Sequence, residues 1–99
     1  MLNINKEKNG TDLIVTLDGR LDTISAPTLE SELQASLDGV TYLCLDMGNV
    51  AYISSAGLRV LLTAERIMDD QGKMVVKNAQ PNVKEVFDVT GFTDVLTLE

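Results

Sequence analysis

The chain has 99 residues, of which 44% are hydrophobic and 23% are charged, and its 15 acidic and 8 basic residues give a net charge of −7. A chain of this length and composition is expected to form one globular domain over residues 1–99, and the acidic balance excludes nucleic acid as a partner, because phosphate binding depends on clustered lysine and arginine. No apolar stretch approaches the ~20 residues that cross a bilayer, and the first residues lack the apolar centre of a signal peptide, so we expect a cytoplasmic protein without a membrane partner.

The first predicted elements are two strands that form a hairpin. Residues 1–8 and 11–19 flank an Asn-Gly dipeptide at positions 9–10, and this dipeptide is typical of a tight β-turn. In the second strand apolar residues alternate with others, so one face of the strand should be buried. The residues expected on that face are Leu13, Val15 and Leu17.

A helix is predicted next, with Ser25 as its N-cap, Pro27 in its first turn and Gly39 just beyond its end. Leucines spaced four residues apart should line its buried face. These are Leu29, Leu33 and Leu37.

The remaining elements alternate between strand and helix. Val40–Asp46 is apolar almost throughout, which suits an interior strand covered on both faces. Its single cysteine, Cys44, is expected to be a small buried hydrophobe. A helix should run from about Ser55 to Asp70 and close near Gly72, and Lys73–Lys77 should form a short strand.

The last helix should begin at Asn78 or Gln80 and end at Gly91, and residues 92–98 should add a short strand or a helical turn. Its apolar side is expected to carry Val83, Val86 and Phe87. The predicted order, β-β-α-β-α-β-α, indicates an α/β fold with a mixed sheet and right-handed crossovers.

The segment ISSAGL at 53–58 opens the second long helix with two hydroxyls and a glycine. Serine readily accepts from the unpaired N–H groups of a first helical turn, so the simplest interpretation makes both Ser54 and Ser55 caps. One capping hydroxyl would explain only one of these serines. It would not explain Gly57, which costs about 1 kcal/mol relative to alanine inside a helix.

Helical spacing divides the rest of this helix into two faces. The core stripe should consist of Gly57, Val60, Leu61, Ala64, Ile67 and Met68. The opposite face should carry a row at i, i+4, i+7 and i+11, made of Ser55, Arg59, Leu62 and Arg66. Leu62 is either a solitary surface apolar residue or the anchor of a docking face on which the arginines are polar contacts.

A phosphoryl group on Ser55 would add a charge of about −1.5 to −2 at a helix N-terminus, where the backbone dipole favours anions. The fold should tolerate it, with Arg59 one turn further on as a possible partner. A protein docked on the same face would have to desolvate that charge. The segment therefore predicts a switch that changes association without unfolding the domain.

Three stretches together resemble the STAS family, named for sulphate transporters and anti-sigma factor antagonists. They are GRLDTISAPTLESEL at 19–33, LCLDMGNVAYISSAGLRVLL at 43–62 and VKEVFDVTGFTDVL at 83–96. The resemblance implies a STAS-type mixed sheet with helices packed mainly on one face.

The resemblance also implies an anti-sigma factor antagonist, which is a substrate and binder rather than an enzyme, with no catalytic residue, cofactor or metal. Its unphosphorylated form would bind an anti-sigma factor that is also a GHKL-type serine kinase, and so free the sigma factor. Phosphorylation would release that partner, and a PP2C-type phosphatase would reset the cycle.

In the family the phosphoacceptor lies two residues before the glycine, which implies Ser55 before Gly57. The preceding residue, often aspartate in the family, is Ser54 here and becomes an alternative acceptor, while Ala56 replaces the usual serine or threonine. The partner-binding set implied is Asp22, Ser54, Ser55, Ala56, Gly57, Arg59, Leu62 and Arg66.

The same residues raise three alternative functions. A non-catalytic STAS subunit of a transport or stress-signalling assembly could bind a protein through the same helix face. A receiver-like Mg²⁺ site would need Asp18, Asp22 and Asp46 to meet, but the first strand offers no acidic pair, and Asp22 and Asp46 more simply accept from nearby backbone N–H groups. A serine hydrolase is excluded because the chain has no histidine to act as base and no Gly-x-Ser-x-Gly elbow.

Overall fold

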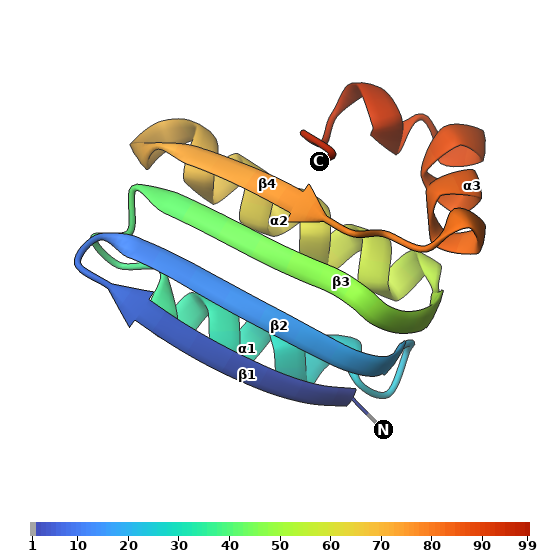
Figure 1. Cartoon of the computed structure of the whole chain (residues 1–99), viewed down its shortest axis with the longest axis horizontal. Coiled ribbons are helices and arrows are strands. Elements are labelled where there is room, and N and C mark those ends of the chain that lie inside the picture. Colours follow the sequence, from blue (N-terminus) through green and yellow to red (C-terminus); the bar gives the residue numbers. More distant parts are fainter. Residues whose placement is uncertain (1) are drawn as a thin grey trace.

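The computed structural model describes residues 2–99, which form a four-stranded sheet in the order β1-β2-β3-β4 (Figure 1). The strands are β1 (Leu2–Asn9), β2 (Asp12–Leu21), β3 (Tyr42–Ile53) and β4 (Lys73–Lys77). The helices are α1 (Ala26–Ser36), α2 (Ser55–Gln71), α3 (Pro81–Thr90) and the short 3-10 helix η1 (Phe92–Asp94). β1 is antiparallel to β2, and β2, β3 and β4 are parallel, which confirms the predicted mixed α/β order.

The hairpin forms as predicted, but its loop lies one residue further along the chain. Asn9 pairs with Asp12, so the two loop residues are Gly10 and Thr11, and Gly10 supplies the positive φ of 62°. The alternating residues Leu13 and Val15 are buried as expected, and their burial fixes this register because a slip by one residue would turn them to solvent. Met1, which was predicted within the first strand, lies outside the described residues.

Helices α1 and α2 lie together on one face of the sheet, behind the strands in Figure 1. The chain crosses from β2 to β3 through α1 and from β3 to β4 through α2, and both crossovers move to the next strand in the same direction. Because crossovers between parallel strands have the same handedness, both helices lie on the same face of the sheet. The register aligns Val15 with Leu45 and Leu45 with Val76 across three strands. The core between sheet and helices includes Leu13, Val15, Leu17, Leu43, Leu45, Met74 and Val76 from the strands and Leu29, Leu33, Leu61 and Met68 from the helices.

β3 is longer than predicted, because it continues beyond Asp46 to Ile53. The sequence predicts that the strand ends at Asp46, but β3 goes on pairing with the long β2 up to Leu21, across two irregularities in register. Cys44 is buried as expected, and burial raises the pKa of its thiol. The thiol therefore stays protonated and unreactive at neutral pH.

α3 covers the part of β3 that extends beyond the short β4. The Gln80 side chain donates to the Gly48 carbonyl at 2.9 Å, and the Asn82 side chain donates to the Ala51 carbonyl at 2.8 Å. These two bonds satisfy carbonyls that β4 is too short to reach. Val83 and Phe87 of α3 are buried, and Gly91 closes the helix as predicted.

The two faces of α2 follow the predicted division. Gly57, Val60, Leu61, Ala64 and Met68 are buried and Ile67 is half-buried. Ser55, Arg59 and Arg66 are exposed, while Leu62 is half-buried. The buried side is wider than predicted, because Leu58 and Glu65 are also buried. Burial raises the pKa of the Glu65 carboxyl, and the nearby Asp69 charge raises it further. No helix within residues 2–99 is both long enough and apolar enough to span a membrane.

Candidate protein-binding site at the N-terminus of α2

The carboxyl ends of the three parallel strands lie at one edge of the sheet, on the right in Figure 1. Residues 22–25 follow β2, Ser54 follows β3 and residues 78–80 follow β4. α2 begins at this edge, directly after β3. The predicted site residues from Asp22 to Arg59 therefore come from adjacent strand ends, the usual position of functional residues in parallel sheets.

The structure gives the two serines different roles. Ser54 is the extended N-cap of α2, and its hydroxyl accepts from the Gly57 N–H at 3.3 Å. Its own N–H donates to the Leu21 carbonyl at 2.9 Å, and its carbonyl accepts from Leu58 at 2.9 Å. Ser54 is thus half-buried, and its hydroxyl, N–H and carbonyl all take part in holding the helix start.

Ser55 is the first residue inside the helix and is exposed. Its hydroxyl makes no hydrogen bond with any residue that the structure describes. The interpretation of both serines as caps is therefore correct for Ser54 and wrong for Ser55. One hydroxyl builds the helix terminus, and the other is exposed at that terminus and makes no hydrogen bond with the described residues.

Gly57 is explained by the close approach of α2 to the end of β2. A β-carbon at this position would lie 2.7 Å from Cγ of Leu21, 2.9 Å from Cγ1 of Ile53 and 3.0 Å from the Leu21 carbonyl oxygen. Only a residue without a side chain lets the first turn of α2 pack this tightly. The same contact sets the position of Ser55, two residues earlier.

We predict that Gly57→Ala destabilises the protein by about 1–3 kcal/mol, because the added methyl group must push Leu21 or the helix aside. Helix propensity alone predicts the opposite effect, an increase of up to about 1 kcal/mol in the free energy of unfolding. Urea denaturation of the two proteins decides between these expectations. A stabilised variant would show that the contact with Leu21 yields without strain.

Asp22 holds the loop between β2 and α1. Its Oδ1 accepts from the N–H groups of Ile24 and Ser25, each at 3.0 Å. The bond from the Ser25 backbone is the largest of the causes that lower the pKa of the Asp22 carboxyl, and Arg20 adds a smaller effect at 3.8 Å. Asp22 therefore lies at the predicted site, but its carboxylate is occupied by the loop.

The described residues do not form the acidic metal site of the receiver-like alternative. Asp46 accepts from the Gly48 N–H at 3.0 Å and from the Asn78 side chain at 3.3 Å, and it lies within β3, whereas Asp22 follows the end of β2. Within residues 2–99, no three acidic or cysteine side chains come together in a way that could hold a metal ion. Both aspartates accept from backbone N–H groups, as the simpler interpretation expected.

A shallow hollow of about 250 Å³ lies between the first turns of α1 and α2. Its lining residues are Thr23, Ala26, Pro27, Glu30, Ala56, Arg59 and Val60. Ala56 and Arg59, both predicted as site residues, thus line one surface with the loop that Asp22 holds. Arg66 is on the same outer row as Ser55, but about 16 Å along the helix from it at 1.5 Å per residue.

Two exposed side chains at this edge were not predicted from the sequence. Ile24 is 87% exposed, and Tyr52 is 41% exposed with the Arg20 guanidinium 4.4 Å above the centre of its ring. The sequence did carry a signal for Ile24, which is an apolar residue that belongs to no periodic stripe. Tyr52 could not be placed, because β3 was expected to end before it.

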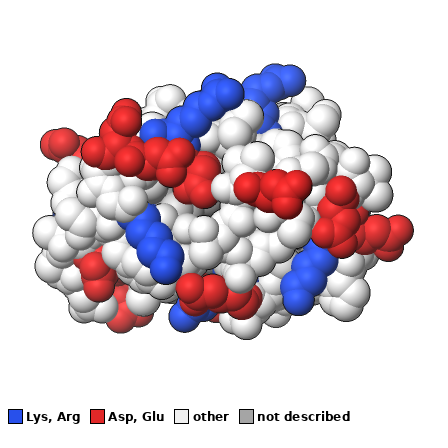
Figure 2. Space-filling view, turned by 90° about the horizontal axis from the view of Figure 1, so that it is seen from above, with Lys and Arg blue, Asp and Glu red and all other residues white. Residues whose placement is uncertain are grey.

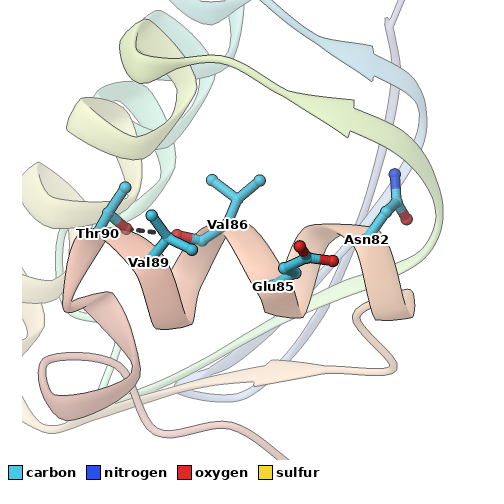
Figure 3. Close-up of a pocket in the computed structure, with 5 residues that line it drawn as sticks. All are labelled: Asn82, Glu85, Val86, Val89 and Thr90. Atoms are coloured by element: carbon cyan, nitrogen blue, oxygen red, sulfur yellow. Dashed lines mark hydrogen bonds between the residues drawn. The ribbon is translucent and has the colours of Figure 1, made fainter.

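A second hollow, of about 340 Å³, is lined by α3 alone (Figure 3). The residues around it are Asn82, Glu85, Val86, Val89 and Thr90, and none of them is a predicted site residue. Figure 2 shows another face of the molecule, where acidic side chains form several groups with lysines and arginines between them. No continuous basic stripe crosses the described residues on that face.

Comparison with known proteins gives consistent similarities. The family model described as the STAS domain matches residues 3–99. The chain is 44% identical over 85 residues to BtrV of Bordetella bronchiseptica, a protein named as an anti-sigma factor antagonist. The matched region covers 84% of this chain and 73% of that protein. It is also 26% identical over 98 residues to the anti-sigma-B factor antagonist of Bacillus subtilis, and this match covers 98% of this chain and 90% of that protein.

Solved structures share the fold. A crystal structure of an anti-sigma factor antagonist from Mycobacterium paratuberculosis matches with a TM-score of 0.89 and 22% identity, over 99% of this chain and 85% of that chain. The unphosphorylated form of the anti-sigma factor antagonist SpoIIAA matches with a TM-score of 0.78 and 17% identity, over 98% of this chain and 87% of that chain. The phosphorylated form of SpoIIAA, from Bacillus, matches with a TM-score of 0.77 and 17% identity, over 98% of this chain and 91% of that chain.

Proposed function

The chain belongs to the STAS domain family, and from this membership we propose that it is an anti-sigma factor antagonist controlled by phosphorylation of Ser55. The unphosphorylated form binds an anti-sigma factor that is also a GHKL-type serine kinase, and thereby frees the sigma factor. Phosphorylation of Ser55 by this kinase releases the complex. The observation that carries the proposal is the exposed Ser55 hydroxyl at the N-terminus of α2, next to a Ser54 hydroxyl that is already used as the cap.

The fold is compatible with a phosphate at this position. The helix dipole favours negative charge at an N-terminus, and the exposed Arg59 guanidinium lies one turn further along the same face. The two forms of SpoIIAA match this chain almost equally, with TM-scores of 0.78 and 0.77. The fold of this chain is therefore found in both a phosphorylated and an unphosphorylated protein.

The effect on a docked partner is different. The docking face in the proposal consists of Asp22, Ser54, Ser55, Ala56, Arg59, Leu62 and Arg66. Gly57 was also predicted to bind the partner, but it is buried against Leu21 and Ile53 and positions the start of α2 instead. A phosphate added within this face must lose water when the partner binds, which is costly for a charged group without a matched counter-charge. A 100-fold loss of affinity needs only about 2.8 kcal/mol. One modification is therefore sufficient to release the partner.

A PP2C-type phosphatase completes the proposed cycle by hydrolysing the phosphoserine. Release of the partner leaves the first turn of α2 open to solvent, so the phosphate on the exposed Ser55 is accessible to a second enzyme. The antagonist itself supplies no catalytic residue in this cycle. It acts as substrate for both enzymes and as ligand for one.

The proposal is tested by mapping the modified residue. Wild type, Ser54→Ala and Ser55→Ala are each incubated with the kinase and ATP, and the phosphopeptides are sequenced by mass spectrometry. We expect phosphate on Ser55 in the wild type and in Ser54→Ala, and no phosphorylation of Ser55→Ala. Loss of the cap costs Ser54→Ala about 1 kcal/mol, so its folding is checked by circular dichroism. Phosphate on Ser54 in the wild type would refute the assignment.

A further inference from the structure

Ile24 has the largest exposed fraction among the large hydrophobic side chains that the structure describes, at 87%. A solitary exposed apolar residue is common on protein surfaces and needs no functional explanation. The surroundings of Ile24 make it different from such a residue, because the loop that carries it is held rigidly and lies beside the proposed phosphorylation site.

Four hydrogen bonds fix the backbone on both sides of Ile24. Asp22 Oδ1 accepts from the N–H groups of Ile24 and Ser25, each at 3.0 Å. The Ser25 hydroxyl accepts from the Asp22 N–H at 3.0 Å and donates to the Arg20 carbonyl at 2.7 Å. A docking partner therefore does not have to order this loop, and the entropy cost of ordering a loop is a major term against association.

The loop borders the hollow between α1 and α2. Thr23, the residue before Ile24, lines that hollow together with Ala56 and Arg59 of α2. Arg59 is exposed and makes no ion pair with the described residues. This corner of the molecule thus combines an apolar side chain on a hydrogen-bonded loop, a hollow that Glu30 also lines, and an arginine without an ion pair among the described residues.

We infer that Ile24 is the hydrophobic anchor through which the unphosphorylated protein docks on its anti-sigma factor, and this inference rests on the proposed function. The partner surface that fits is an apolar pocket, which receives the Ile24 side chain, bordered by a carboxylate that pairs with Arg59. Complete burial of an isoleucine side chain on docking corresponds to a gain of at least about tenfold in affinity. Ile24 then contributes affinity, and Ser55 controls release.

Affinity measurements on matched variants test the anchor. The dissociation constant for the purified anti-sigma factor kinase of the same bacterium is measured calorimetrically for the wild type, Ile24→Ser, Ile24→Leu and Val89→Ser. Val89 on α3 is the matched control, because it is an apolar side chain with a similar exposed fraction of 81% in the separate hollow of Figure 3. We expect Ile24→Ser to bind at least about tenfold more weakly, and Ile24→Leu and Val89→Ser to bind like the wild type, all with unchanged melting temperatures.

The possible results separate the anchor from the proposed function. Wild-type affinity in Ile24→Ser, equal weakening in Val89→Ser, or equal affinities of Ile24→Ser and Ile24→Leu would each overturn the anchor. A melting temperature several degrees lower in Ile24→Ser would show that Ile24 contributes to folding, and would also overturn the anchor.

If the wild type itself did not bind the kinase, the proposed function would fail, and the anchor would fail with it. If wild type bound and was released by ATP while Ile24→Ser behaved identically, only the anchor would fail.

Discussion

Ser55→Asp is expected to bind the anti-sigma factor kinase at least tenfold more weakly than Ser55→Ala, which should bind as tightly as the wild type and resist release by ATP. The aspartate places a fixed negative charge at the first residue of α2, within the proposed docking face. Truncation to alanine removes a hydroxyl that makes no hydrogen bond with the described residues. A tenfold difference corresponds to about 1.4 kcal/mol, less than the doubly charged phosphate should produce.

Folding and binding should separate in these variants. A carboxylate in the first turn of a helix contributes about 0.3–1 kcal/mol of favourable interaction with the helix dipole. Ser55→Asp should therefore melt at or slightly above the temperature of the wild type while it loses affinity. Circular dichroism gives the first quantity and isothermal titration calorimetry gives the second.

A matched control adds the same charge elsewhere. Ser31 is an exposed serine in the middle of α1, and Ser31→Asp is expected to bind like the wild type. If Ser31→Asp and Ser55→Asp lost affinity equally, the cause would be the total charge of the protein, which is already −7. Equal affinity of Ser55→Asp and Ser55→Ala would remove the basis for an electrostatic switch at this residue.

The sequence was informative wherever one local pattern decided the outcome. Helical spacing identified the buried side of α2, and alternation identified the buried side of β2, because each depends on a single element facing a single core. The length of β3 could not be read in the same way. Beyond Gly48 it pairs with β2 and accepts from side chains at the start of α3 that lie more than thirty residues away.

The candidate site shows the same limit more sharply. The sequence places Ser54 and Ser55 side by side at a helix start, and either could cap it. The choice depends on the extended backbone of Ser54 and on its bond to the Leu21 carbonyl, which belongs to another strand. The exposure of Ile24 likewise depends on how Asp22 and Ser25 fold the loop. Those are tertiary facts, and residue type alone does not specify them.

Gly72 shows how a correct prediction can rest on an incomplete reason. The sequence predicted it as the residue that closes α2, and it is the C-cap, with its N–H donating to the Met68 carbonyl at 2.7 Å. The structure adds a tertiary contact. A β-carbon at Gly72 would lie 1.9 Å from the carbonyl oxygen of Thr41, just before β3, and 2.6 Å from its carbonyl carbon.

Gly72→Ala should therefore destabilise the protein strongly, with a loss of about 3 kcal/mol or more in the free energy of unfolding. The clash is with backbone, which cannot rotate away as the end of a side chain can. The Thr41 carbonyl also accepts from the Lys73 N–H at 2.9 Å at the start of β4. Relief of the clash must disturb this bond and hence the join between β3 and β4.

A domain of this size loses about 4–8 °C of melting temperature per kcal/mol, so thermal denaturation should show a fall of more than about 10 °C for Gly72→Ala. Gly39→Ala is the matched control, because its β-carbon meets nothing within 4 Å but its φ of 77° is unfavourable for alanine, which costs about 1–2 kcal/mol. Equal losses in the two variants would mean that the backbone yields at Thr41 and that the contact is not tight. A clearly larger loss at Gly72 would show that the end of α2 is held against the start of β3 by direct backbone contact, as the start of α2 is held against Leu21 at Gly57. Both ends of the helix that carries Ser55 would then be fixed by glycines, which allows its outer face to change charge while the helix stays in place.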